Sequence, residues 1–545
     1  MSRSADVVVI GAGHNGLVAA CYMARAGLDV VVCESWDVAG GCISTVELPD
    51  GRGRLERGAY VHGGLRGSGI ADDLELESKY GLEFIELPEL LLDPLDDGTA
   101  IAMHESAERT AELIEPVVGS KDAASYLDFA RWGAAWTGLL DQVNNGPAPG
   151  MRGLSALAEA TLGSEGARLM QQLLASASTI SREFFEDERL QGMVAHWGAH
   201  SQQPPGDPGT GAGALVLGGW HGAPTVRPKG GSIGTPEALV RCLEAAGGEL
   251  RLSCPVEKVE VSGGAARAVI AGGERIEARK AVVSTVDARR LFLGLIDNSQ
   301  VPDSLLAEVG RIHVGGRNVA ELKVDGITAS TPKLPGPDGF GRTLMLSPGT
   351  LPEMEKAFAN IALGELPERP SLMIGFPSLL EPGWAPEGQQ SVWVSTFIPW
   401  QLKSGPWDEK ALEAAGDHTW QAVEKALGTE IELSERHVMS AQDWVDKTGN
   451  PFSSPNHVEM SIDQMLSNRP SPSLSSYRTP IDGLYLSGAG THPGGGVTGM
   501  PGRNAARTVL KELGAGGKGR LESFRNQAAM MRDAFRAVRQ LRKAA

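Results

Sequence analysis

The chain lacks features that define several common classes of protein. It has five cysteines in 545 residues, and no two of them have CxxC spacing: Cys21, Cys33, Cys42, Cys242 and Cys254. This argues against a disulfide framework, a close redox-active cysteine pair and a zinc site. We therefore expect no metal ion, and a reducing, cytoplasmic location fits the cysteine content.

Long apolar runs and an excess of basic charge are also absent. No run of 18 apolar residues predicts a transmembrane helix, and the start MSRSADVVVIGAG enters a strand without a secretory leader. The formal net charge of −17 argues against a nucleic-acid partner, because phosphate binding needs a basic face. With 545 residues, two interlocked domains are expected.

What is present begins with a strand, a turn, a helix and a second strand. Residues 5–10 form a continuous apolar run typical of a buried parallel strand, and residues 11–16 form the turn. Residues 17–26 predict a helix that Gly27 ends, and residues 28–33 predict a second buried strand. This order indicates a βαβ unit.

The turn carries a nucleotide-binding fingerprint. Gly11, Gly13 and Gly16 match GxGxxG, and Glu34 stands 18 residues beyond Gly16, at the end of the second strand. Gly11 permits a tight turn, Gly13 lets a pyrophosphate approach the backbone, and Gly16 lets the helix pack on the strand. An ordinary glycine turn would not explain the acidic residue at this offset. The Glu34 carboxylate favours a free ribose 2′-hydroxyl, so NAD and FAD both fit and NADP does not.

The C-terminal part returns to the same pattern. Residues 483–487 predict a buried strand, residues 488–496 a glycine-rich loop and residues 501–513 a helix. We expect the first and the last strand to lie in one sheet. The cofactor domain is then discontinuous, with a substrate domain inserted into it.

Three motifs resemble the phytoene desaturase-like branch of the FAD-dependent amine oxidase and carotenoid desaturase superfamily. They are GAGHNGLVAA at residues 11–20, NHVEMSIDQM at 456–465 and GAGTHPGGGVTGMPGRNAA at 488–506. The resemblance implies noncovalent FAD. Its residues would be Gly11, Gly13, Gly16, Glu34 and Gly41 at the ADP half, Val256 at the adenine, and Gly490, Gly496, Val497 and Met500 beside the isoalloxazine.

Two departures from the family pattern accompany the resemblance. Cys42 follows the pair Gly40-Gly41 where many amine oxidase relatives have arginine, which puts a direct contact between arginine and phosphate in doubt. No cysteine follows Cys254, so a C-terminal cysteinyl–flavin bond is excluded.

The fold class expected is α/β, a Rossmann-type FAD-binding domain with an inserted mixed α+β substrate domain. The FAD-binding domain would comprise residues 1–104, 225–305 and 470–515, and the substrate domain residues 105–224, mainly helical, and 306–469. Residues 201–234, rich in glycine and proline, are expected to form a loop. Residues 516–545 predict a separate basic amphipathic helix.

Two histidines are candidates for chemistry. His492 lies inside the C-terminal glycine loop and His457 in the NHVEM segment, where either could orient substrate or pass a proton. The alternative is that each only packs or hydrogen-bonds its loop. His196, His200 and His221 accompany Trp197 and Trp220, and core or surface positions explain them better than a metal site does.

The C-terminal helix has its own alternatives. Residues 516–545 carry eight basic and two acidic residues beside an apolar stripe. Such a helix can lie on a membrane surface, or dock on the acidic body of the chain or on a second subunit. Peripheral membrane contact and a homo-oligomer both stay open.

The function expected is an FAD-dependent oxidoreductase that takes hydride from, desaturates or isomerises a hydrophobic or amphipathic substrate. The alternatives are an amine oxidase that uses oxygen and a non-redox lipid- or prenyl-binding protein of the same fold. No second GxGxxG occurs between a strand and a helix, since GTGAG at 209–213 is followed by no convincing helix. Oxygen or a quinone is therefore favoured as electron acceptor over a second nucleotide.

Overall fold

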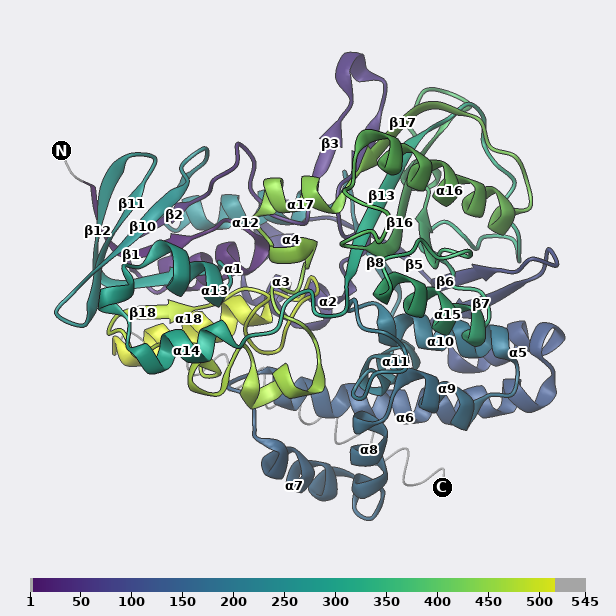
Figure 1. Ribbon diagram of the computed structural model, residues 1–545, viewed down its shortest axis with the longest axis horizontal. Coiled ribbons are helices and arrows are strands. Elements are labelled where there is room, and N and C mark those ends of the chain that lie inside the picture. Colours follow the sequence, from purple (N-terminus) through teal and green to yellow (C-terminus); the bar gives the residue numbers. More distant parts are fainter. Residues whose placement is uncertain (1–2, 515–545) are drawn as a thin grey trace.

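Two seven-stranded sheets lie side by side, with a layer of helices below the second sheet (Figure 1). The computed structural model describes residues 3–514. The expected C-terminal helix at 516–545 lies outside these residues. None of the helices within 3–514 combines the length and the apolar character needed to cross a membrane.

The first sheet joins strands from the beginning, the middle and the end of the chain. In spatial order its strands are β10 (Val256–Ser262), β11 (Ala265–Ala271), β12 (Glu274–Ser284), β1 (Arg3–Ile10), β2 (Val30–Cys33) and β9 (Glu249–Arg251), and β18 (Leu484–Leu486) also pairs with β12. β9, β2, β1, β12 and β18 run parallel, whereas β11 pairs antiparallel with both β10 and β12. The expectation that the first and last strands share a sheet is confirmed.

Both faces of the first sheet are covered, which explains why its central strands are apolar throughout. Val7 and Val9 of β1 pack toward α1 (His14–Arg25), α12 (Gly234–Ala245) and α18 (Met500–Glu512). The alternate residues Val8 and Ile10 pack toward α13 (Ala288–Arg290), the following turn Leu291–Leu295 and α14 (Asp303–Gly310). A parallel strand buried on both faces has no polar side, so the period-two pattern disappears.

The second sheet is mainly antiparallel. Its order is β17 (Leu433–Met439), β13 (Val319–Thr328), β16 (Gln390–Pro399), β15 (Leu372–Gly375), β14 (Met345–Ser347), β6 (Glu89–Pro94) and β7 (Ala100–His104). One face packs on α16 (Glu409–Leu427) through Leu322, Val324 and Trp420. The other, which we call the inner face, meets α15 (Leu351–Ala362) and the helical layer through residues such as Phe397.

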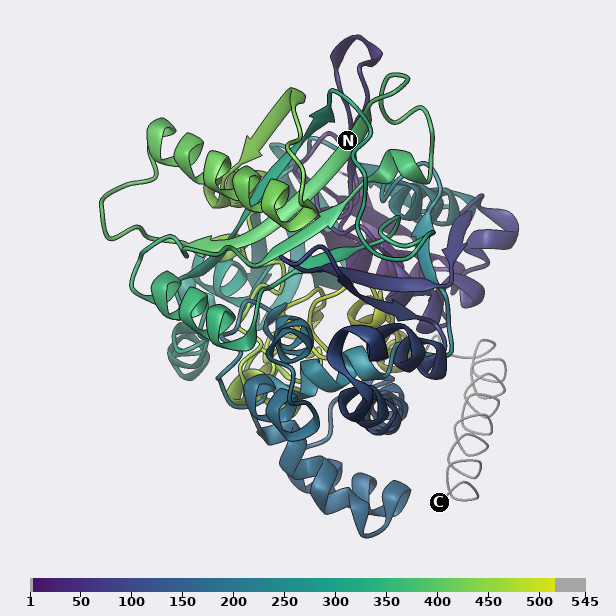
Figure 2. The same ribbon diagram turned by 90° about the vertical axis from the view of Figure 1, so that its right-hand side faces the viewer.

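The helical layer lies mainly between residues 107 and 218. Its helices are α5 (Ala107–Val118), α6 (Ser120–Asn144), α7 (Met151–Leu162), α8 (Glu165–Leu174), α9 (Ala177–Phe184), α10 (Glu188–Ala199) and α11 (Gly211–Gly218). They lie below the second sheet in Figures 1 and 2, with α7 and α8 farthest from it. Small elements join the parts: β3 (Thr45–Glu47), β4 (Arg54–Glu56), α2 (Gly63–Gly67), α3 (Ile70–Asp73), α4 (Leu76–Lys79), β5 (Phe84–Leu87), β8 (Thr225–Pro228) and α17 (Ala441–Thr448).

The expected loop at residues 201–234 is wrong in part, because it contains α11 and β8. The statement that no helix follows GTGAG is wrong for the same reason. The glycines of this segment serve helix packing: a Cβ atom on Gly133 of α6 would lie 2.3 Å from the carbonyl carbon of Gly218. No strand immediately precedes α11, since α10 and a turn come before it, so the segment still lacks the strand that a nucleotide fingerprint needs.

Candidate cofactor-binding and active site

A cavity opens where the parallel strands of the first sheet end. Ile10, Cys33, Thr285 and Gly488, at or just beyond the carboxyl ends of β1, β2, β12 and β18, all line it. Ligands of open α/β sheets bind in this place. Six of the residues expected to hold FAD line the same cavity: Gly11, Gly13, Gly16, Glu34, Gly41 and Val256.

The glycine turn has the geometry that the fingerprint predicts. Gly11 has a φ of +94°, a left-handed conformation that favours glycine. A Cβ on Gly16 would lie 2.1 Å from the carbonyl oxygen of Gly11, so only glycine lets α1 approach β1 here. A Cβ on Gly13 would meet nothing within 4 Å. The space over Gly13 belongs to the cavity.

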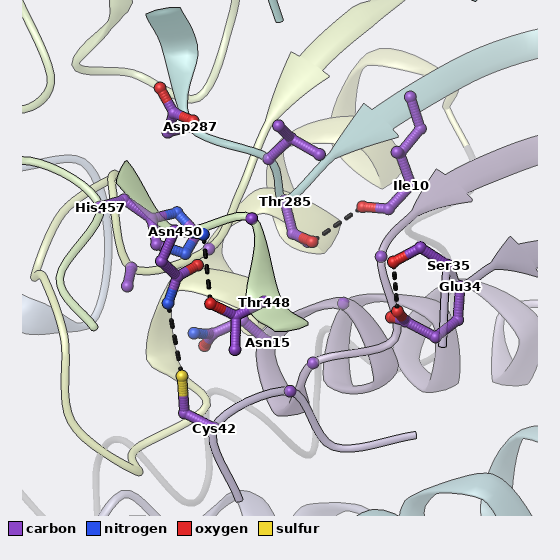
Figure 3. Close-up of a pocket in the computed structure, with 18 of the residues that line it drawn as sticks. Ile10, Asn15, Glu34, Ser35, Cys42, Thr285, Asp287, Thr448, Asn450 and His457 are labelled. Carbon is purple, nitrogen blue, oxygen red and sulfur yellow. Dashed lines mark hydrogen bonds between the residues drawn. The ribbon is translucent and has the colours of Figure 1, made fainter. Parts of the chain in front are cut away.

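Glu34 fixes the other side of this turn. Its Oε2 accepts a hydrogen bond from the backbone N–H of Ala12 at 2.7 Å, and its Oε1 accepts from the N–H of Trp36 at 3.0 Å. The Ser35 hydroxyl donates to Oε1 at 3.0 Å (Figure 3). The carboxylate is therefore held in one orientation at the rim of the cavity, where a ribose hydroxyl can donate to its remaining lone pairs.

Several lining residues were missed by the sequence analysis. Thr285, Asp287 and Arg290 follow β12, and the Thr285 hydroxyl donates to the Ile10 carbonyl at 2.8 Å. The Asp287 side chain caps α13 by accepting from the N–H of Arg290, and burial raises its pKa. These residues carried a usable signal, because they directly follow a buried strand of the same sheet.

A second missed group comes from the segment after α17. Asn450 donates from Nδ2 to the Cys42 sulfur at 3.4 Å and from its backbone N–H to Thr448 at 3.1 Å. Figure 3 shows Cys42, Asn450 and His457 gathered at one end of the cavity and Glu34 and Ser35 at the other. Burial raises the pKa of the Cys42 thiol to about 12, so Cys42 is a neutral hydrogen-bonding group at neutral pH.

His457 lines the cavity, and its role in orienting substrate or passing a proton stays a prediction. Its φ is +64°, uncommon for a residue other than glycine, and its Nδ1 is buried with no hydrogen-bond partner among residues 3–514. Burial lowers the pKa of His457 to about 4. At neutral pH the imidazole is uncharged and has one ring nitrogen to offer to a ligand.

His492 lies elsewhere. It is 1 % exposed, and its Nε2 is 3.1 Å from the carbonyl oxygen of Val143 in α6. It is not among the residues lining the cavity, and burial lowers its pKa to about 4. The contact with α6 shows that His492 packs the glycine loop against this helix, while its role in proton transfer stays a prediction.

The C-terminal glycine loop contacts residues that line the cavity. A Cβ on Gly490 would lie 3.4 Å from the Cβ of His457, and the Gly496 carbonyl oxygen is 3.2 Å from Nε2 of the lining residue His14. Val497 and Met500 pack with the apolar core beside α1. The assignment of these four positions, Gly490, Gly496, Val497 and Met500, to the isoalloxazine stays a prediction.

The residues present fit FAD. The open face of Gly13 lies at the start of α1, where the first turn leaves backbone N–H groups free for phosphate oxygens. Asn15 Oδ1 and His457 Nδ1 are buried and lack partners within residues 3–514, and both residues line the cavity. Such atoms cost free energy unless a ligand or water satisfies them.

Cysteine and metal chemistry are not indicated. All five cysteines are free thiols, and Cys33, which lines the cavity, lies in contact with Cys254. Burial, with a smaller contribution from Cys254, raises the pKa of Cys33 to about 12, which opposes thiolate formation. No group of histidine, cysteine and carboxylate side chains within residues 3–514 could hold a metal ion.

The tryptophans and histidines of the helical layer form an aromatic cluster. Trp197 stacks on His200 with ring centroids 4.5 Å apart and contacts Trp220 edge-on at 4.3 Å. Nδ1 of the fully buried His196 lies 2.7 Å from the Ser371 hydroxyl. A core position therefore accounts for His196, and a surface position accounts for His200.

Curated relatives align over nearly the whole chain. Pyridine nucleotide-disulfide oxidoreductase domain-containing protein 2 of Rattus norvegicus is 31 % identical, covering 93 % of this chain and 94 % of its own. A limonene dehydrogenase component of Castellaniella defragrans is 25 % identical over 94 % and 95 %. Hydroxyneurosporene desaturase of Cereibacter sphaeroides is 25 % identical over 93 % and 98 %.

Solved structures share the fold. An oxidoreductase from Methanosarcina mazei matches with a TM-score of 0.58 and 17 % identity, covering 93 % of this chain and 99 % of its own. Cyclohexylamine oxidase from Brevibacterium oxydans matches with a TM-score of 0.57 and 15 % identity, over 93 % and 99 %.

Two family models match segments of the chain that contribute to the cofactor site. Residues 9–71 match the NAD(P)-binding Rossmann-like domain, and residues 219–510 match the flavin containing amine oxidoreductase family. The two matches include the glycine turn, Glu34, His457 and the C-terminal glycine loop. The chain therefore belongs to the flavin containing amine oxidoreductase family and is an FAD-dependent oxidoreductase.

Proposed function

We propose that the chain oxidises a hydrophobic or amphipathic organic substrate by hydride transfer to FAD, as a dehydrogenase or desaturase. The observation that carries the proposal is the aromatic and apolar inner face of the second sheet. Tyr60 stacks on Trp393 of β16 with ring centroids 5.6 Å apart, and both belong to one apolar cluster with Phe397 and Met373. The Trp393 indole donates to the Gly58 carbonyl at 2.9 Å, which ties this face to the segment that follows Cys42.

The relatives agree with a substrate of this kind. Their names specify limonene, phytoene and hydroxyneurosporene, and the alignments with them cover most of the chain or half of it. Limonene is a hydrocarbon, which a protein binds mainly by burying apolar surface. An aromatic face near a cofactor cavity suits such a ligand.

FAD, when bound, accepts the hydride. The residues of this chain orient the substrate and exclude water. Neutral His457 can accept or donate one hydrogen bond, and the Asn450 amide can do the same beside Cys42. A flavin reaction of this kind needs positioning more than a strong base, which agrees with the lowered pKa of His457, since a histidine with a low pKa is a weak base.

The proposal is tested by mixing the purified, FAD-containing protein anaerobically with a panel of terpenoids, carotenoids and other lipophilic compounds in detergent. Bleaching of the oxidised flavin absorbance by at least one of them is expected. A protein that holds FAD but is bleached only by amines would contradict the hydrophobic substrate.

An amine is the second candidate substrate. The family match and the acidic side chains Glu321 and Asp325 on the inner face of β13 favour it, because carboxylates attract a cationic amine. We further propose oxygen or a quinone as the electron acceptor. Production of hydrogen peroxide from amines in air would favour the amine, and reoxidation by quinone in the absence of oxygen would favour the quinone.

A further inference from the structure

Three charged residues lie on one face of β13. Glu321, Lys323 and Asp325 alternate along the strand and point to its inner face. Lys323 is satisfied: its Nζ donates to Asp325 Oδ1 at 3.0 Å and to the Glu56 carbonyl at 3.1 Å, and lies 4.4 Å from the centroid of the Trp393 ring. Asp325 also accepts from the N–H of Val394 at 3.2 Å.

The Glu321 carboxyl has longer hydrogen bonds than the Lys323–Asp325 ion pair. Its Oε2 accepts from the Ser395 hydroxyl and its Oε1 from the Gln202 amide, both at 3.3 Å, and it forms no ion pair with the residues described. Burial raises the pKa of Glu321, whereas the two hydrogen bonds and Lys323 oppose the rise. A carboxyl group in this setting can change its protonation without breaking a strong contact.

Glu321 interacts with residues that line two cavities. Gln202 lines a second, small cavity together with Gln203 and Val319. Val319 precedes Glu321 by two positions on β13 and so lies on the same face of the strand. Cys42 lines the cofactor cavity, and its thiol pKa is raised chiefly by burial and in part by the charge of Glu321. The turn Pro451–Ser453, next to the Cys42 partner Asn450, contacts β13.

The second cavity has the polar groups that a water molecule needs. Gln202, Gln203 and Ser454 line it, and the Oε1 of Gln203 is buried without a partner among the residues described. Gln202 has a φ of +65° and uses its side-chain amide to reach Glu321. Water in this cavity would therefore be separated from the Glu321 carboxyl by the side chain of Gln202, which donates a hydrogen bond to that carboxyl.

We propose that Glu321 is the proton-exchanging residue of the redox centre: it takes up a proton from the second cavity when FAD is reduced and releases it when FAD is reoxidised. The inference rests on FAD occupying the cofactor cavity, as in the proposed function. Reduction of bound FAD by two electrons and one proton adds one negative charge to the cavity. The carboxylate then binds one proton that comes from bulk solvent through the water of the second cavity, so the local charge is unchanged.

The direction follows from electrostatics. A new negative charge near a carboxyl group raises its pKa, because two like charges repel in a region of low dielectric constant. The other charged and titratable groups on β13 and on the elements packed against it are Lys323 and Asp325 of β13, Cys42, Glu56 of β4, Lys447 of α17, and Glu435 and His437 of β17. Glu321 is the carboxyl group of this set that forms no ion pair among the residues described, and it accepts a hydrogen bond from Gln202 of the second cavity.

The test is a reduced-minus-oxidised infrared difference spectrum of the full-length, FAD-loaded protein, with dithionite as reductant. The C=O stretch of a protonated carboxyl should appear on reduction and shift in D₂O. Glu321→Gln should lack this band and take up one proton fewer per FAD, as measured with a pH indicator. Glu89→Gln is the matched control: Glu89 is a buried carboxyl on β6 of the same sheet, and burial raises its pKa to about 7. It should keep the redox-linked band.

An unchanged band and proton count in Glu321→Gln would overturn the proposal. If that variant does not fold, Gln202→Leu and Ser395→Ala remove one hydrogen bond each and should raise the pH up to which the band is seen, because both bonds favour the carboxylate. No change in that pH would also overturn it. Purified protein without flavin absorbance would instead contradict the proposed function, so the two failures can be told apart.

Discussion

Two alanine substitutions in the glycine turn should separate cofactor binding from folding. Gly13 has a φ of −61° and a ψ of 161°, which alanine adopts without strain, and its added Cβ meets no protein atom within 4 Å. Gly13→Ala should therefore stabilise the FAD-free protein by about 0.4–1 kcal/mol through the unfolded chain. If a phosphate approaches this backbone, the methyl group displaces it and removes at least one charge-assisted hydrogen bond, about 1.5–3 kcal/mol. FAD should then bind roughly 10–150-fold more weakly.

Gly16→Ala is the matched control, because it adds the same methyl group three residues away. Its Cβ would lie 2.1 Å from the Gly11 carbonyl oxygen and 3.2 Å from the Thr285 side chain, so α1 must move away from β1. Such overpacking costs about 1–3 kcal/mol of folding free energy even without FAD. Thermal unfolding of the FAD-free proteins and fluorescence titration with FAD measure the two effects. Normal FAD affinity in Gly13→Ala would refute the placement of the pyrophosphate over this residue.

Four further outcomes are expected. Glu34→Gln replaces an acceptor with an amide N–H₂ against the N–H of Ala12 or Trp36, so FAD retention through gel filtration should fall by about tenfold or more, and unchanged occupancy would contradict the ribose contact. Gly496→Val forces a β-branched residue to a φ of +96° and should lower the FAD content measured by absorbance; normal content with an unshifted flavin potential would refute the flavin loop. Burial lowers the pKa of His196 to about 3, below the 6.5 of an ordinary histidine, so the unfolded chain binds the proton more readily than the folded chain. The contribution of the neutral His196 to stability is therefore present above pH 6.5 and is lost as the pH falls toward 3. His196→Gln should flatten the fall of the unfolding temperature between pH 7 and 5. Truncation after Gly517 should leave FAD bound and change oligomeric state or membrane association, and loss of flavin would show that the tail supports the cofactor site.

The part of the site that the sequence predicts is the part encoded by neighbouring residues. Gly11, Gly13, Gly16 and Glu34 belong to one strand–helix–strand unit, so their spacing alone determines where they meet. Asn450 could not be found in this way. Its position at Cys42 depends on β13, β16 and α17 folding back onto the first sheet, which no local pattern records.

The error at α11 has a different cause. Glycine favours loops in an isolated peptide because it has the greatest conformational freedom. In the folded chain Gly218 faces the carbonyl oxygen of Phe129, where a Cβ would lie 2.9 Å away, and the helix is buried between α6 and α10. Close packing there offsets the low helix propensity, so the same residues that predict a loop permit a buried helix.

The order of strands in the first sheet has a consequence for synthesis of the protein. β12 lies between β1 and β18, which are separated by more than 470 residues of chain. At a translation rate of about 5–20 residues per second, roughly 25–95 s pass between the synthesis of the first strand and that of the last. During that time the carboxyl-terminal part of β12 that pairs with β18 has an exposed edge, and the cavity beside the glycine turn is incomplete. Flavin capture is therefore expected only after β18 has been synthesised, and chains cut short before β18 have an open sheet edge that chaperones must shield or proteases remove.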